Sequence, residues 1–167
     1  MHLVDLPQAC PDVVVDLRYA RAQNITGHIL YSQDFVVQLD DSAARALQTV
    51  AVSLKEQGYQ LVLWDAFRPD AVQQQLLQVN PAYTDTYVLS NSNHCKGLAV
   101  VVTLSTLDGD LLDMGTDHDD FSERAHVDSK DLSTTQIANR KLLTDTMQAP
   151  GFTVWPYEWW HFNFVEA

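Results

Sequence analysis

The chain has 167 residues, of which 46 % are apolar and 19 % are charged, as is typical of a globular protein. Its formal net charge of −12 argues against nucleic acids and anionic membranes as partners, because both require a basic face. No stretch approaches the roughly 18 apolar residues of a membrane span, and no signal peptide is visible. We therefore expect one domain over residues 1–167 and a cytoplasmic location.

Apolar periodicity predicts short strands at residues 11–19, 60–64 and 98–104, and a hairpin in the aromatic stretch near the C-terminus. A helix is predicted at about residues 41–56, and a short one should turn Val72, Leu76 and Val79 inward. The Ser133–Gln136 spacing is that of a capping box, which predicts a third helix to about residue 147. Strands with separate helices indicate an α+β domain.

Two polar segments interrupt these elements. Residues 90–97 form a polar loop ahead of the most apolar strand, and residues 114–124 form a long acidic loop. Loops of the second kind in a compact domain are usually functional or mobile. The acidic loop is therefore a candidate region for functional residues.

Glu158 and His161 lie three residues apart among large aromatic side chains. Apolar surroundings favour the neutral form of a carboxylate, which brings it toward the pKa of a useful general base. A neighbouring imidazole can bind a metal. By itself, however, the pair is more consistent with the polar edge of an aromatic strand.

His94 is the best placed of the six histidines, because it lies in the polar loop just before a buried strand. Alone, it would be a solvated loop residue. The same applies to three residues elsewhere: Arg68 is consistent with a surface ion pair, Asp119 with a solvated acid, and Tyr19 with core packing. Their combination decides the interpretation.

Five motifs in order make the chain similar to a known family. They are Tyr19-Ala-x-x-x-Asn-Ile-Thr-Gly27, Trp64-Asp-Ala-Phe-Arg-Pro69, Ser92-x-His-x-x-Gly-x-Ala99, the acidic loop from Asp113 to Arg124, and Glu158-Trp-Trp-His-Phe162. This arrangement resembles the zinc D-alanyl-D-alanine dipeptidases associated with vancomycin resistance (the VanX type, peptidase family M15). The resemblance implies a hedgehog-like fold with a central antiparallel sheet flanked by helices.

The resemblance also implies a catalytic apparatus. His94 and His161 would ligate Zn²⁺, and Glu158 would be the general base. Arg68 would stabilise the oxyanion of the tetrahedral intermediate, a role that suits its permanent charge.

The remaining implied roles concern the substrate, D-alanyl-D-alanine. Asp119 and Tyr19 would hold its free ammonium group. Ser92 and Asn93 would lie near its carboxylate.

One position departs from the family pattern. The third ligand of the family is an Asp seven residues after the first His, where this chain has Val101. A valine has no lone pair, whereas catalytic zinc sites normally have three protein ligands. Two interpretations follow: a dipeptidase that is impaired by the loss of one ligand, or a catalytically inactive domain that binds a D-Ala-containing peptide or a protein partner.

Overall fold

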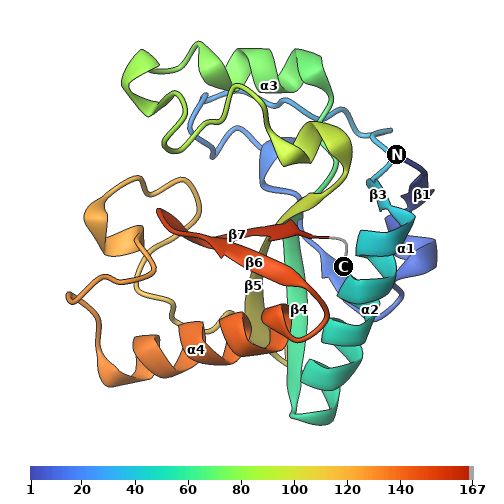
Figure 1. The fold of residues 1–167 in the computed structure, drawn as a ribbon, viewed down its shortest axis with the longest axis vertical. Helices are drawn as coiled ribbons and strands as arrows, with labels where there is room; N and C mark the ends of the chain where they lie inside the picture. The colour runs from blue at the N-terminus through green and yellow to red at the C-terminus, as the bar shows by residue number, and fades with distance from the viewer. Residues whose placement is uncertain (166–167) are drawn as a thin grey trace.

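The computed structural model describes residues 1–165, and its centre is a five-stranded sheet in the order β2-β4-β5-β7-β6. The strands are β2 (Val13–Val15), β4 (Tyr59–Asp65), β5 (Ala99–Thr106), β6 (Phe152–Trp155) and β7 (Glu158–Phe164). β2 runs parallel to β4, whereas the other three pairings are antiparallel. The predicted α+β fold is therefore confirmed, with a mainly antiparallel central sheet (Figure 1).

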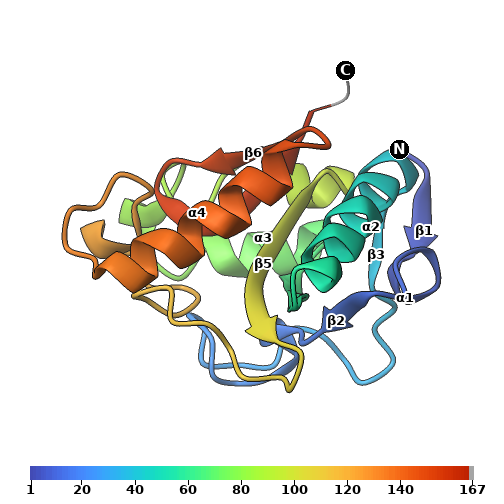
Figure 2. The same ribbon diagram turned by 90° about the horizontal axis from the view of Figure 1, so that it is seen from below.

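Two long helices cover one face of the sheet and contact each other: α2 (Asp41–Glu56) and α4 (Thr134–Gln148) (Figure 2). Asp40 caps α2 by accepting a hydrogen bond from a backbone N–H of its first turn. The predicted capping box between Ser133 and Gln136 opens α4. Both helices begin and end close to where the sequence predicts.

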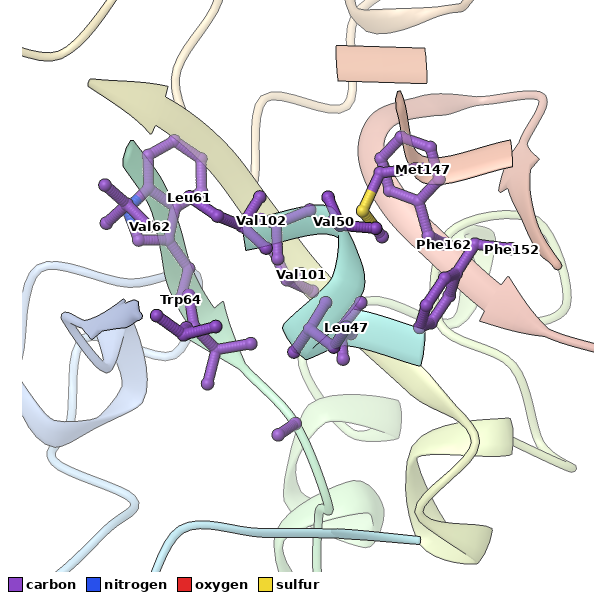
Figure 3. Packing of buried hydrophobic residues seen from close by; sticks show 14 of the residues in the cluster. Leu47, Val50, Leu61, Val62, Trp64, Val101, Val102, Met147, Phe152 and Phe162 are labelled. Atoms are coloured by element: carbon purple, nitrogen blue, oxygen red, sulfur yellow. The ribbon is translucent and has the colours of Figure 1, made fainter. Parts of the chain in front are cut away.

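The shorter α3 (Asp70–Leu77) lies on the opposite side of the molecule from α4 (Figure 1). The interior is accordingly divided into two apolar clusters. The larger one joins the sheet to α2 and α4, and Figure 3 shows part of it, including Leu47 of α2 and Val102 of β5. The smaller one lies under α3 and contains Tyr19 and Leu76. Residues from both clusters line the cavity described below.

A second sheet pairs β1 (Leu3–Asp5) with β3 (Gln38–Asp40), and the single-turn α1 (Leu6–Ala9) follows β1. The sequence pattern did not predict these elements, because strands of three residues are too short to show a clear alternation. The connections also contain four 3₁₀ helices: η1 (Arg18–Ala20), η2 (Pro81–Tyr83), η3 (Asn93–Lys96) and η4 (Glu123–Ala125).

Two local predictions were wrong. The strand predicted for residues 11–19 is limited to β2, an edge strand whose Val14 and Val15 are 39 % and 37 % exposed. Its β-branched run fits a half-covered edge as well as a buried strand. Val79 does not turn inward with Val72, because α3 ends at Leu77 and leaves Val79 37 % exposed. Within residues 1–165, no helix is long and apolar enough to span a bilayer.

Candidate active site

His94 is held in one orientation by the short η3 helix. The Ser92 side chain caps η3 by accepting a hydrogen bond from the His94 backbone N–H. Gly97 ends η3 with a φ of 66°, and a Cβ at this position would come within 2.6 Å of the Leu3 side chain. The residue must therefore be glycine, both for its backbone conformation and for space.

The hydrogen bonds of His94 define its protonation. Its Nδ1 lies 2.6 Å from the carbonyl oxygen of Ala66, which can only accept, so Nδ1 carries the proton. Its Nε2 is buried and has no hydrogen-bond partner among the described residues. Burial first, then the nearby charges of Arg68 and His161, lower the pKa of His94 well below its usual value. His94 therefore presents a neutral imidazole with a free lone pair.

His161 lies next to His94, and their ring centroids are 4.9 Å apart. His161 Nδ1 is 3.1 Å from a Glu158 carboxylate oxygen, and both side chains are almost fully buried. Residues three apart in a regular strand point to opposite faces. Here the register of β6 and β7 shifts between Val154 and Trp155, which gives β7 the irregularity that lets Glu158 and His161 meet.

Arg68 follows the end of β4 and is buried in an ion pair. Its Nε and Nη2 donate to one Asp65 oxygen at 3.0 and 2.7 Å, and its Nη1 donates to Gln73 at 2.7 Å. The other Asp65 oxygen accepts from the Tyr31 hydroxyl. Burial opposes the charge of Arg68, but the Asp65 carboxylate together with Tyr19 and Tyr31 outweighs it, so the pKa of Arg68 is raised. One N–H on each terminal nitrogen remains for another acceptor.

Asp119 is positioned by the N-terminal segment and by its own loop. Its two carboxylate oxygens accept from the Tyr19 hydroxyl at 3.2 Å and from the Ile25 backbone N–H at 3.0 Å. Burial, followed by the Asp119 charge, raises the pKa of Tyr19 well above its usual value, so Tyr19 remains a donor. Asp119 has a φ of +60°, a conformation that non-glycine residues adopt infrequently.

These side chains converge on one cavity. The predicted site residues that line it are Tyr19, Arg68, Ser92, His94, Asp119, Glu158 and His161. Asn93 is not among the lining residues; its amide donates to Asn163, which also lies 3.3 Å from His161 Nε2. The space open to the centre of a water-sized sphere is only about 20 Å³, room for about one water molecule. Any ligand larger than a water molecule would therefore require the side chains that line the cavity to move.

Sequence reasoning missed three polar residues at this site: Asp65, Gln73 and His118. His118 Nε2 lies 3.3 Å from Asp119, and the His118 ring packs against Tyr19 and Trp64. Asp65 lies three residues before Arg68 in the same motif, and this spacing of opposite charges was the available signal for an ion pair. His118 had none beyond its proximity in sequence to Asp119.

The zinc site implied by the resemblance fits these residues only in part. The buried, unpartnered Nε2 of His94 suits a metal ligand. The ring of His161 lies beside it, but both ring nitrogens of His161 already contact other side chains, Glu158 and Asn163. Val101, which stands where the third ligand is expected, is 2 % exposed and has no donor atom. Within residues 1–165, no group of three or more His, Cys, Asp or Glu side chains could hold a metal ion. We therefore assign no catalytic step to a metal in this chain.

Comparison with solved structures supports the fold. The vancomycin-resistance D,D-pentapeptidase VanY, solved as a mutant in complex with Zn(II), gives a TM-score of 0.51 at 15 % identity over 81 % of this chain and 78 % of that one. The LD-carboxypeptidase LdcB gives a TM-score of 0.51 at 19 % identity, over 81 % of this chain and 64 % of that one.

Comparison with known sequences identifies the family. The chain is 36 % identical over 168 residues to a D-alanyl-D-alanine dipeptidase of Escherichia coli, covering 99 % of this chain and 86 % of the relative. Dipeptidases of the same name from Enterococcus faecalis and Enterococcus faecium are 29 % and 31 % identical, over 90 % and 88 % of this chain and 85 % and 83 % of theirs. The peptidase M15 family model, described as D-ala-D-ala dipeptidase, matches residues 1–167. The chain therefore belongs to the D-Ala-D-Ala dipeptidase family of M15 peptidases.

Proposed function

We propose that this chain accepts a free dipeptide of the D-alanyl-D-alanine type in the cavity between Arg68 and Asp119, with Glu158 as its general base. Hydrolysis is impaired, because Val101 replaces the carboxylate that the family pattern places there. One observation carries the proposal: a single cavity is lined by the predicted base, two imidazoles, a buried cation and a buried carboxylate, namely Glu158, His94, His161, Arg68 and Asp119.

The negative charge in the cavity suits the ammonium group of a dipeptide, and the positive charge suits its reacting carbonyl. The carboxylate of Asp119 is the partner of the substrate ammonium, and Tyr19 holds that carboxylate in place. The two remaining N–H groups of Arg68 stabilise the negative charge that develops on the carbonyl oxygen. Ser92 and Asn93 are assigned to the substrate carboxylate, although Asn93 would have to exchange its contact with Asn163.

The ammonium partner restricts the substrate to free dipeptides. An N-acylated or longer peptide would have no ammonium group to pair with Asp119, which is buried with 8 % of its side chain exposed. Leaving that carboxylate buried and unpaired costs a few kcal/mol. The same contacts therefore provide both affinity and a length limit.

Metal analysis beside a hydrolysis assay tests this function. We expect the purified chain to retain little zinc and to release little D-alanine from D-alanyl-D-alanine, even with zinc added. The variant Val101→Asp should gain both. If Val101→Asp neither binds zinc nor hydrolyses the dipeptide, the assignment of the site is wrong.

A second candidate is a binding domain without catalysis. Val101 favours it, because this residue is part of the buried core and leaves the metal ligands incomplete. Calorimetry shows whether D-alanyl-D-alanine binds, and a D-alanine assay then separates the two candidates. A binding domain releases no D-alanine at any zinc concentration, whereas an impaired enzyme releases a small amount that increases with added zinc.

A further inference from the structure

Residues 113–126, a segment that contains the acidic loop and is called the loop below, bring Asp119 to the cavity. Both ends of this segment contact α4. The loop lies between β5 and α4 in the chain. His118, Asp119 and Phe121, near its middle, line the cavity. Asp119 itself lies in the middle of this loop and has a strained backbone. Its position therefore depends on what holds the two ends of the loop.

Arg140 of α4 joins those two ends. Its Nε donates to the Met114 carbonyl at 2.7 Å, on the outgoing arm of the loop. Its Nη1 and Nη2 donate to the carbonyls of His126 and Arg124 at 3.1 and 3.0 Å, on the returning arm. Met114 lies ten or more residues before the other two acceptors, Arg124 and His126, yet all three carbonyls bind the same guanidinium group. Only an arginine offers such a planar fork of donors.

The face of α4 that carries Arg140 makes further contacts with the start of the loop. Gln136 donates to the Asp113 carboxylate at 2.8 Å, and Asn139 donates to the Asp113 carbonyl at 2.8 Å. The helix therefore presents three polar side chains to one loop. Gln136 also reaches the returning arm, where it accepts from the Arg124 side chain at 3.4 Å, but Arg140 makes three shorter hydrogen bonds to backbone carbonyls of both arms.

Arg140 also connects the loop to the strand of the general base. Its guanidinium lies 5.5 Å from the ring centroid of Trp159, the residue after Glu158. The Trp159 ring N–H donates to the Thr116 hydroxyl at 2.7 Å, so Trp159 binds the outgoing arm as well. Burial, followed by the Arg124 charge, lowers the pKa of Arg140 to about 10, so the group is still charged at neutral pH.

We propose that Arg140 is a positioning residue that fixes Asp119 relative to Glu158 by holding the base of the loop against α4 and β7. Its role is to keep the Asp119 carboxylate in contact with Tyr19 and Ile25. The statement about loop geometry stands without a ligand, whereas its consequence for dipeptide binding rests on the proposed function.

Hydrogen exchange in the ligand-free protein tests the geometry directly. The Ile25 amide donates to Asp119, so its exchange rate reports whether Asp119 is in place. In Arg140→Lys, which keeps the charge but not the planar fork, we expect the Ile25 amide to exchange about tenfold faster. Amides of the β4–β5 pairing should be unchanged. Lys141→Met is the matched control on the same helix, because Lys141 pairs only with the exposed Asp145 in the described structure.

The outcomes are distinct. An unchanged Ile25 rate in Arg140→Lys overturns the proposal, and so does an equal rise at Ile25 and in the sheet, which would mean a general loss of stability. If Arg140→Lys does not fold, Arg140→Gln takes its place, because its side chain has one donor nitrogen in place of the three that Arg140 uses. An unchanged Ile25 rate in Arg140→Gln would then reject the proposed anchor.

Calorimetry with two ligands tests the consequence. D-alanyl-D-alanine has the ammonium group, and propionyl-D-alanine lacks it. We expect Arg140→Lys to weaken the dipeptide about tenfold and the analogue by less than twofold. Equal weakening of both ligands contradicts the positioning role. If the unmodified chain binds neither ligand, the proposed function fails, while the exchange result still decides the role of Arg140.

Discussion

Val101 and His161 lie directly opposite each other in the antiparallel pairing of β5 and β7. Val101 therefore stands next to the two imidazoles, and the departure from the family pattern falls inside the site rather than on a distant strand. Val101 also belongs to the main core cluster. Its side chain therefore packs in the core at a position where it cannot bind a metal.

The first prediction concerns Val101→Asp. Without zinc, the new carboxylate is a buried unpaired charge, and we expect the free energy of unfolding to fall by several kcal/mol. With zinc, three ligands are available, so the melting temperature should rise above that of the same variant in chelator. Thermal denaturation with zinc and with chelator measures the difference. Val102→Asp, on the next residue of β5, should be destabilised in both conditions; a similar zinc response there would remove the support for position 101.

The second prediction separates the structural and functional parts of Arg68. Arg68→Gln leaves Asp65 buried without its cation, so the free energy of unfolding should fall by about 3–5 kcal/mol. The double variant Asp65→Asn/Arg68→Gln removes both charges and keeps an acceptor for Tyr31. It should recover a large part of that loss in urea denaturation, but not dipeptide binding. Full recovery of binding in the double variant would show that Arg68 serves only the ion pair.

The third prediction concerns Asp119→Asn. The substitution removes the charge that pairs with the ammonium group. Its one remaining oxygen can still accept from the Ile25 amide, and its new NH2 group can donate to the Tyr19 hydroxyl. We expect the affinity for D-alanyl-D-alanine to fall at least tenfold in calorimetry and the preference over N-acetylated dipeptide to disappear. Asp117→Asn, two residues away and 71 % exposed, is the control that should change neither quantity.

The fourth prediction is a pH dependence of stability from Cys10. Its thiol is fully buried and donates to the Ala44 carbonyl, and burial raises its pKa from 9.0 to about 11. The unfolded chain therefore loses this proton before the folded chain does. The stabilisation is complete below about pH 9 and should be lost as the pH rises to 11. Over these two pH units the change is on the order of 2–3 kcal/mol.

Urea denaturation of the unmodified chain and Cys10→Ala, each at pH 8 and pH 10.5, measures this contribution. The difference in unfolding free energy between the two proteins should shrink at the higher pH. A difference that does not depend on pH would mean that the Cys10 thiol titrates normally in the folded protein. The comparison cancels the titration of the tyrosines, which are present in both proteins.

Much of the architecture was predictable from local pattern alone. Helix α2 shows its apolar face and its Asp40 cap in the sequence, and residues 98–104, which include most of β5, are apolar except for Thr103, as expected of a central strand. The parallel pairing of β2 with β4 was not predictable. Neither was the small β1–β3 sheet, because pairing partners depend on contacts between segments that are distant along the chain.

For the candidate site, the sequence by itself determined which residue types are present, their order, and the valine at position 101, since these are properties of single positions. Only the tertiary structure decided that Arg68 is already paired with the buried Asp65, that His118 joins Asp119, and that Asn93 turns toward Asn163. It likewise revealed the hydrogen bonds of Arg140 to both arms of the loop. The reason is physical: a hydrogen bond or an ion pair depends on distances of about 3 Å, and these distances arise only when remote segments pack together.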